Sequence, residues 1–274
     1  MSNSGNENLF IQQPVHVELD LSSARRVFVF GDIHGYLGNI EKAMRKVGYD
    51  AAAGDRMIGL GDWLDRGEET LEIGYFIEDH QDDLVFVKGN HEQMLEDAFV
   101  PGPNAMDPGM LIRNGGSWVL GIMDEEELEN DRIVATPEGR RLLKAVCGAP
   151  IAITATMPSG SKVGFVHAEV RRILEMLDWN VFTGVLEQQG EQGGIAQEAI
   201  WARTEYKNLD KIKVAMGAKA PTSEYVANID HVFHGHTIVK DVMTWGNRSW
   251  IDIGSYANSK IAFIDVEKHL KAQK

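Results

Sequence analysis

Three apolar segments among the first hundred residues each run into a glycine followed by aspartate or asparagine, and this repeated design constrains the fold more than any other feature. Each segment has the length and the β-branched or aromatic content of a buried strand. Apolar residues at helical spacing follow each polar junction. The three junctions are Phe30-Gly31-Asp32, Leu60-Gly61-Asp62 and Lys88-Gly89-Asn90.

Strands that alternate with helices pair in parallel through helical crossovers, so these units predict a parallel sheet. In such a sheet, ligands gather at the carboxyl ends of the strands. All three polar junctions lie at that end. We therefore expect a single site that is fed by three strand ends.

The pattern lapses between residues 101 and 140, where Pro101-Gly102-Pro103 marks a break and residues 124–131 form an acidic run. We interpret this stretch as an inserted helical or loop region over the site. Its acidic run is interpreted as a solvated face. A helix is predicted over residues 137–146, with Pro137 in its first turn.

The second half of the chain is predicted to be rich in strands. The expected elements are a hairpin of 151–156 with 162–166, a helix over 168–177, a strand-to-loop junction at 231–237, a hairpin of 238–245 with 249–253, and a strand over 261–266.

We expect one α/β domain over residues 26–267, with the insertion at about 101–140. Residues 1–25 form an N-terminal extension whose start is expected to be disordered and whose end is expected to form an edge strand. The basic tail over residues 268–274 is expected to fray.

The chain has 274 residues and a net charge of −14, which argues against nucleic-acid and membrane partners because these bind basic surfaces. An anionic substrate would therefore need local cationic groups. The single cysteine, Cys147, excludes an internal disulfide and fits a reducing compartment. Because no apolar segment could span a bilayer or serve as a signal peptide, we expect a cytoplasmic protein.

Residues of metal-ligand type gather at the predicted strand ends. Oxygen ligands mixed with imidazoles suit Mn²⁺, Fe or Zn²⁺. Asp62, at the middle junction, is the natural bridge between two ions that would lie about 3.5–4 Å apart. The set comprises Asp32, His34, Asp62, Asn90, His91, His167 and His236.

Simpler roles stay open for several of these residues. The first junction, taken alone, could be a simple turn, and Asp65 could be a turn former. Asn90 could cap a helix as well as bind a metal. His167 could be a buried histidine without a ligand, and Arg203 could be a surface charge.

Five motifs, in order, resemble those of the metallophosphoesterases and, within them, the phosphoprotein phosphatase family. The resemblance is greatest to the compact bacterial and phage-lambda-type protein phosphatases, and it covers residues 26–255. The motifs are Gly31-Asp32-Ile33-His34-Gly35, Gly61-Asp62-Trp63-Leu64-Asp65-Arg66-Gly67, Gly89-Asn90-His91-Glu92, Val166-His167-Ala168 and Gly235-His236-Thr237. Supporting segments are Asn114-Gly115-Gly116-Ser117-Trp118, Trp201-Ala202-Arg203-Thr204 and Trp250-Ile251-Asp252-Ile253-Gly254.

This resemblance implies an α/β (α+β) fold in which a β-sandwich of two mixed sheets is flanked by helices. It also implies two divalent metal ions, with Mn²⁺ preferred over Fe or Zn²⁺. The first ion would bind Asp32, His34 and Asp62. The second ion would bind Asp62, Asn90, His167 and His236.

The resemblance also assigns catalytic roles. His91 would protonate the leaving oxygen, and Asp65 would orient and charge-stabilise that imidazole. Arg66 and Arg203 would bind the phosphoryl oxygens, which answers the need for local cationic groups. Physical chemistry supports both assignments, because histidine titrates near neutral pH and arginine offers several planar donors.

The expected function is hydrolysis of phosphomonoesters by in-line attack of a hydroxide activated by two metals, on phosphorylated serine or threonine of a phosphoprotein or phosphopeptide. The alternatives are a nucleotide hydrolase, such as a symmetrical diadenosine-tetraphosphatase, and a catalytically silent phosphopeptide-binding module. Asp65-Arg66 favours the phosphatase, since relatives that cleave dinucleotides tend to show Ala-Arg there. Two residues depart from the family pattern. Lys88 stands where the family usually has arginine, and Glu169 stands where the small phosphatases more often have aspartate.

Overall fold

A four-stranded sheet carries the three units predicted from the sequence. The structure, a computed structural model, describes residues 14–99, 108–123, 136–208 and 219–273. The strands of this sheet are Arg26–Phe30 (β2), Asp55–Gly59 (β3), Leu84–Phe86 (β4) and Phe263–Asp265 (β10). Its order is β10-β2-β3-β4, with β2, β3 and β4 parallel and β10 antiparallel to β2. The predicted parallel pairing of the three units is confirmed.

A six-stranded mixed sheet packs against the first. Its strands are His16–Asp20 (β1), Ala152–Thr156 (β5), Lys162–Val166 (β6), His231–His234 (β7), Met243–Trp245 (β8) and Arg248–Trp250 (β9). They are ordered β1-β5-β6-β7-β9-β8. Both predicted hairpins are confirmed, and β1 is the expected edge strand. The start of the extension and the acidic run over 124–131 lie outside the described residues, and the domain boundaries at 26 and 267 stay a prediction.

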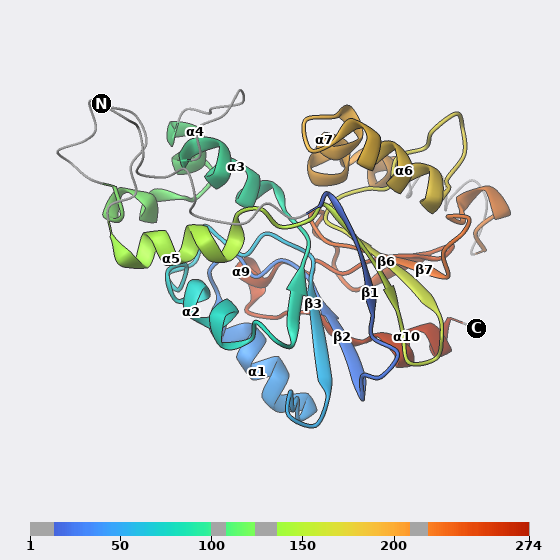
Figure 1. Cartoon of the computed structure of the whole chain (residues 1–274), viewed down its shortest axis with the longest axis horizontal. Coiled ribbons are helices and arrows are strands. Elements are labelled where there is room, and N and C mark those ends of the chain that lie inside the picture. The colour runs from blue at the N-terminus through green and yellow to red at the C-terminus, as the bar shows by residue number, and fades with distance from the viewer. Residues whose placement is uncertain (1–13, 100–107, 124–135, 209–218, 274) are drawn as a thin grey trace.

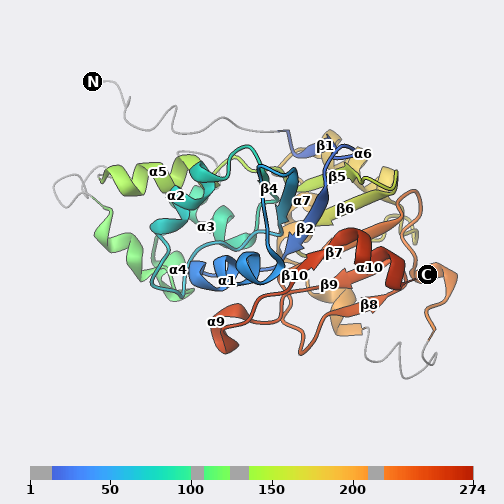
Figure 2. The same cartoon turned by 90° about the horizontal axis from the view of Figure 1, so that it is seen from below.

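Helices cover the outer faces of the two sheets (Figure 1). They are Leu37–Val47 (α1), Glu72–Asp79 (α2), Asn90–Phe99 (α3), Pro108–Arg113 (α4), Pro137–Val146 (α5), Trp179–Gln189 (α6), Gly194–Trp201 (α7), Ser255–Asn258 (α9) and Val266–Ala272 (α10), with 3₁₀ turns at Ser117–Gly121 (η1) and Thr222–Glu224 (η3). Figure 2 shows α1, α2, α4 and α5 grouped on one side of the molecule, away from β6, β8 and β9. Within the described ranges, no helix combines the length and apolar character that crossing a membrane requires. The predicted helix-flanked sandwich of two mixed sheets is confirmed.

Alternation along β2 explains how the layers form. Val27 and Val29 point into the core between the two sheets, where Phe165 of the other sheet also lies. Phe28 and Phe30 point the other way and pack against the helices that cover the four-stranded sheet. Because successive side chains of a strand face opposite sides, one short segment serves both cores.

The helix predicted over residues 168–177 is wrong. The segment is a loop with one isolated bridge between Ile173 and Met176. Val170 is buried against α6 and α7, whereas Leu174 is 85% exposed. The apolar residues therefore do not share one face, so burial does not favour a helix here.

The prediction that the tail frays is also wrong. Residues from Val266 onward form α10, and the Asp265 side chain accepts a hydrogen bond from the N–H of Lys268 at 3.1 Å. Val266 and Leu270 are buried one turn apart. An N-cap and a short apolar stripe therefore stabilise a helix where charge composition indicated none.

Asp55, at the start of β3, is a buried carboxylate held by two arginines. It accepts hydrogen bonds from Arg25 Nη2 at 2.5 Å, from Arg26 Nη2 at 2.6 Å and from the N–H of Asp50 at 2.9 Å. Burial alone would raise the pKa of Asp55, but these hydrogen bonds hold that pKa well below its usual range. The ionised carboxylate therefore stabilises the folded state.

Replacing Asp55 with asparagine should lower the free energy of unfolding by about 2 kcal/mol, less than for a fully buried pair because both arginines are partly exposed. Urea unfolding at neutral pH measures this change. Because the folded-state pKa is depressed, the difference from the wild type should shrink as the pH falls below about 4.

Glu41→Gln is the control, because Glu41 and Arg45 form an exposed pair at 3.5 Å. It should change stability by less than about 0.5 kcal/mol. An unchanged urea midpoint for Asp55→Asn would contradict a stabilising role for this carboxylate.

Candidate metal centre

The loops that follow β2 and β3 are joined by backbone hydrogen bonds. The N–H groups of Ile33 and His34 donate to the carbonyl of Asp62 at 3.2 and 3.0 Å, and Gly35 donates to Trp63 at 2.8 Å. His34 and Asp62 have left-handed φ angles of 47° and 52°. Residues with side chains rarely adopt this conformation, and it persists only where the surroundings impose it. The fold therefore fixes both side chains at the sheet edge.

Glu92, in the first turn of α3, joins the second loop to the third. Its buried carboxylate accepts hydrogen bonds from the N–H groups of Asp62 and Trp63, both at 2.8 Å. It also accepts one from Gly89 at 2.9 Å. Burial and the nearby Asp62 carboxylate raise the pKa of Glu92 to about 7. The sequence showed Glu92 only as the last residue of the motif Gly89-Asn90-His91-Glu92 and did not indicate this link between two loops.

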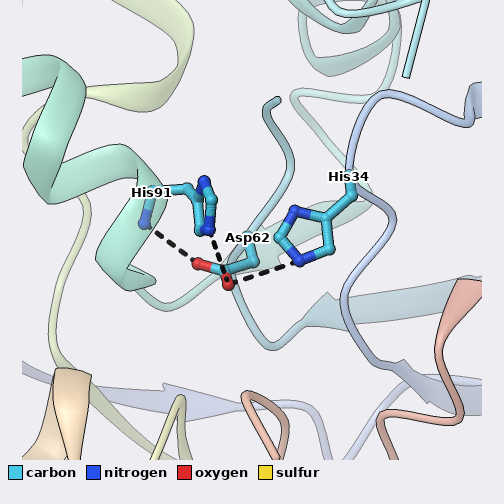
Figure 3. Close-up of side chains that lie close together, drawn as sticks. All are labelled: His34, Asp62 and His91. Carbon is cyan, nitrogen blue, oxygen red and sulfur yellow. Dashed lines mark hydrogen bonds and ion pairs between the residues drawn. The ribbon is translucent and has the colours of Figure 1, made fainter. Parts of the chain in front are cut away.

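Asp62 lies at the centre of the site. Its Oδ2 is 3.6 Å from Nε2 of His34 and 3.9 Å from Nε2 of His91 (Figure 3), and its Oδ1 is 3.3 Å from Nε2 of His167. Burial raises the pKa of Asp62, but the surrounding histidines lower it well below its usual range. Two groups of ligand atoms, each within 4.8 Å, share this carboxylate: His34, Asp62 and His91, and Asp62, His167 and His236.

His167 and His236 present bare nitrogens to the same space. Nδ1 of His167 donates to the Leu60 carbonyl at 2.6 Å, and Nε2 of His236 donates to the Trp201 carbonyl at 3.1 Å. Burial lowers the pKa of both histidines, so their remaining nitrogens carry no proton. The remaining nitrogens, Nε2 of His167 and Nδ1 of His236, lie 3.1 Å apart. Oδ1 of Asn90 lies 3.1 Å from Nε2 of His167. Neither nitrogen can donate to the other, whereas a divalent cation suits all three atoms.

The carboxylates on the other side of the site also fit a cation. Both oxygens of the buried Asp32 accept from the N–H of His236 at 3.1 Å. Burial and the carboxylates of Asp252 and Asp62 raise the pKa of Asp32. Nδ1 of His34 donates to a backbone carbonyl at 2.9 Å, so Nε2 carries no proton and offers its lone pair to the site. Carboxylate, amide and imidazole donors together fit a divalent transition metal.

His91 has a carboxylate partner that fixes its orientation. Its Nδ1 is 2.5 Å from Oδ2 of Asp65, whose Oδ1 accepts from the indole N–H of Trp118 at 2.6 Å. Burial lowers the pKa of His91, but Asp62 and Asp65 raise it by more, so the net shift is upward. Nε2 of His91 faces Asp62 and is placed to deliver a proton into the site (Figure 3).

The two predicted arginines reach the same site. Nη1 and Nη2 of Arg66 lie 2.5 Å from Nε2 of His34 and 3.1 Å from Nε2 of His91. Arg203 has an exposed side chain whose Nη2 donates to the carbonyl of His236 at 3.1 Å. The structure thus brings all the predicted site residues together, and the individual roles assigned to them stay predictions.

Comparison with known proteins identifies the family. The family model described as calcineurin-like phosphoesterase matches residues 25–240. The chain belongs to this family. Calcineurin-like phosphoesterases are metal-dependent enzymes, so the predicted family and enzyme class are confirmed. Serine/threonine-protein phosphatase 2 of Escherichia coli strain K12 is 25% identical to this calcineurin-like phosphoesterase over 244 residues, 89% of this chain and 94% of that protein.

Solved structures share the fold of this calcineurin-like phosphoesterase. A protein serine/threonine phosphatase from Saccharomyces cerevisiae aligns with a TM-score of 0.56 and 15% identity, over 94% of this chain and 78% of that one. A putative diadenosine tetraphosphatase aligns with a TM-score of 0.51 and 15% identity, over 91% of this chain and 96% of that one. At these identities the likeness establishes the fold alone.

Three residues that border the phosphoesterase site were not predicted from the sequence. Asp252 is buried, and its pKa is raised to about 6 by burial and by Asp62. It lies in the supporting segment Trp250-Ile251-Asp252-Ile253-Gly254 but lacks the preceding glycine that marked Asp32. Tyr256 packs its ring 4.6 Å from the guanidinium carbon of Arg66. Trp118 ends the supporting segment Asn114-Gly115-Gly116-Ser117-Trp118, whereas Tyr256 carries no local sequence signal, because single aromatic residues are common in cores.

Proposed function

We propose that this phosphoesterase is a serine/threonine protein phosphatase that uses two divalent ions, with Mn²⁺ as the preferred metal and the cytoplasm as its location. The observation that carries this proposal is that Asp62 is shared by two groups of metal-ligand side chains. Asp32, which lies outside these groups, would complete one site with His34 and Asp62, and His91, the third member of that group, would serve as the proton donor instead of a ligand. Asn90, His167 and His236 would complete the other.

When bound, the metals would supply Lewis acidity that lowers the pKa of water and offsets charge on the phosphoryl group. The residues of the chain would do the rest. His91 would give a proton from Nε2 to the leaving oxygen, because the carboxylates of Asp62 and Asp65 raise its pKa and favour the protonated imidazole. Asp65 would hold the imidazole through the 2.5 Å contact at Nδ1 and stabilise its charge.

Arg66 and Arg203 would bind the phosphoryl oxygens. Guanidinium groups offer planar, paired donors that match phosphate geometry. Arg66 is held by ring stacking on Tyr256, and its nitrogens already lie among the imidazoles of the site. On a chain with a net charge of −14, these two cations would supply the local attraction that an anionic substrate needs.

The choice of a protein substrate over a dinucleotide rests on the Asp65–His91 pair and on the curated relative. The relative from Escherichia coli is named a serine/threonine-protein phosphatase. Asp65 both binds His91 and receives the hydrogen bond from Trp118, so the position is built around a carboxylate. An alanine at this position would leave the imidazole without its partner.

Metal-stripped protein should not hydrolyse p-nitrophenyl phosphate, and added Mn²⁺ should restore turnover, because Asp62, His167 and His236 direct ligand atoms into one space. Initial rates with Mn²⁺, Fe²⁺, Zn²⁺ and Mg²⁺ measure the metal preference. The loaded enzyme is then given a phosphoserine peptide and diadenosine tetraphosphate side by side.

Faster hydrolysis of the phosphopeptide supports the proposal, and faster hydrolysis of the dinucleotide supports the nucleotide hydrolase instead. Protein that binds Mn²⁺ but turns over neither compound would be a phosphopeptide-binding module. No turnover with any divalent metal would overturn the enzymatic proposal.

A further inference from the structure

Glu169 is a buried carboxylate that binds three successive backbone N–H groups. Its Oε2 accepts from Thr204 and Glu205, both at 3.0 Å, and its Oε1 accepts from Tyr206 at 2.9 Å. Its exposed fraction is 4%. Hydrogen bonds from N–H groups to an ionised carboxylate are stronger than those between neutral groups. This side chain therefore fixes the backbone of residues 204–206.

The fixed segment directly follows Arg203. The N–H of Thr204 belongs to the peptide bond that begins at the carbonyl of Arg203, so any movement of Thr204 moves Arg203 as well. The Arg203 side chain is exposed, and it donates to the carbonyl of His236 at 3.1 Å. An exposed arginine has many rotamers, so its backbone must supply much of its placement.

The chain is also fixed just before Arg203. The indole N–H of Trp201 donates to Gln93 Oε1 at 2.6 Å, and the Trp201 carbonyl accepts from Nε2 of His236 at 3.1 Å. Arg203 thus lies between two anchored points, Trp201 on one side and the segment bound by Glu169 on the other.

Glu169 connects this segment to the metal centre through the chain itself. It lies two residues after His167, whose Nε2 is 3.3 Å from Oδ1 of Asp62. The short stretch from His167 to Glu169 therefore holds a proposed metal ligand at one end and the Arg203 segment at the other. A shift at either end would change the distance between Arg203 and the metals.

We propose that Glu169 is a positioning residue that sets the place of Arg203 relative to the metal centre. Glu169 does not touch the substrate and acts only through the backbone after Arg203. The inference rests on the proposed function, in which Arg203 binds phosphoryl oxygens. It assigns a role to a residue that the sequence showed only as a departure from the family pattern.

Glu169→Gln keeps the size of the side chain but removes its charge and replaces one acceptor with a donor. In the full-length, Mn²⁺-loaded enzyme, kcat/KM for p-nitrophenyl phosphate should fall about 10-fold, mainly through a higher KM. Mn²⁺ affinity should stay unchanged. In an Arg203→Ala background, the same substitution should cause almost no further loss, because the two residues act as one unit.

Asp178→Asn is the matched control. Asp178 also uses a carboxylate to accept from successive N–H groups, those of Asn180 at 2.9 Å and Val181 at 3.1 Å, at the start of α6. Both bonds go to one oxygen, which asparagine keeps, so the variant should leave KM unchanged and alter the melting temperature only slightly. If Glu169→Gln does not fold, Glu169→Asp keeps the charge on a shorter side chain and should show a smaller rise in KM.

The outcomes separate this inference from the proposed function. If Arg203→Ala raises KM but the Glu169 variants do not, the positioning role is overturned and the proposed function stands. Equal effects of the Glu169 substitution with and without Arg203 also overturn it, since they indicate a general loss of stability. If Arg203→Ala leaves kcat and KM unchanged, the role proposed for Arg203 fails, and the role of Glu169 fails with it.

Discussion

Asp62→Asn should abolish the binding of two metal ions and reduce turnover of p-nitrophenyl phosphate by about 10³-fold or more. The reason is that both groups of ligand atoms share this carboxylate. Asparagine keeps one oxygen but removes the negative charge that balances two divalent ions. Metal content of the purified protein and initial rates over a range of Mn²⁺ concentrations measure the two effects.

The melting temperature of the metal-free protein distinguishes a loss of metal binding from a loss of folding. Oδ1 of Asp62 accepts from the N–H of His91 at 3.1 Å, and the asparagine oxygen can keep this bond. The carboxylate also raises the pKa of the neighbouring Asp32, so its removal relieves repulsion. Because the surrounding histidines hold the pKa of Asp62 low, removing its charge also loses favourable interactions, so the metal-free variant should melt somewhat earlier than the metal-free wild type but still unfold cooperatively.

Asp230→Asn is the control variant, because Asp230 is exposed and accepts a backbone hydrogen bond from Lys162 at 2.7 Å. It should change neither metal content nor rate. A folded Asp62→Asn protein that still binds two ions and turns over normally would show that Asp62 is not a shared ligand.

His91→Asn should reduce kcat by about 10²–10⁴-fold while both ions stay bound, because the variant loses the proposed proton donor and keeps every residue that is proposed as a metal ligand. The loss should be larger for a phosphoserine peptide than for p-nitrophenyl phosphate. The serine alkoxide is a strong base that needs a proton as it leaves, whereas p-nitrophenolate is stable without one. Comparing kcat for the two substrates in wild type and variant measures this dependence on the leaving group.

His231→Asn is the control for His91. His231 is buried at the first position of β7, in the six-stranded sheet, and its Nε2 lies 2.9 Å from Oγ of Ser249. It should lower stability without changing the ratio of rates for the two substrates. An equal loss for both substrates in His91→Asn would mean that His91 does not act as the general acid.

The half of the site that comes from the first hundred residues could be predicted from the sequence by physical reasoning. Asp32, Asp62 and Asn90 each follow a glycine at the end of an apolar segment, and parallel pairing puts such ends at one edge. The signal is local, so it can be read without knowing the fold.

The other half required the family resemblance. His167 ends β6 in much the way that His234 ends β7, yet His167 faces Asp62 while His234 stacks on Trp250. Nothing in the adjacent residues distinguishes them. Arg203 has the same difficulty, because its place depends on Glu169, which lies 34 positions earlier in the chain (203 − 169).

Elements held by distant contacts were also the ones that sequence patterns missed. The loop over 168–177 is anchored by Arg172, which donates to Glu205 and Glu224. These charged partners come from segments far along the chain, so the local sequence pattern, which favoured a helix, did not reveal them. Tertiary contacts override weak local preference in such segments.

The proposed metal ligands come from both sheets, and this division sets an order of events during synthesis. Asp32, Asp62 and Asn90 follow strands of the four-stranded sheet, whereas His167 and His236 follow strands of the six-stranded sheet. A ribosome that has released only the first hundred residues has made three oxygen ligands and no imidazole from the second sheet. The second ion would therefore bind stably only after the chain beyond β7 has emerged and the two sheets have packed. The bound ions would then link the early and late halves of the protein.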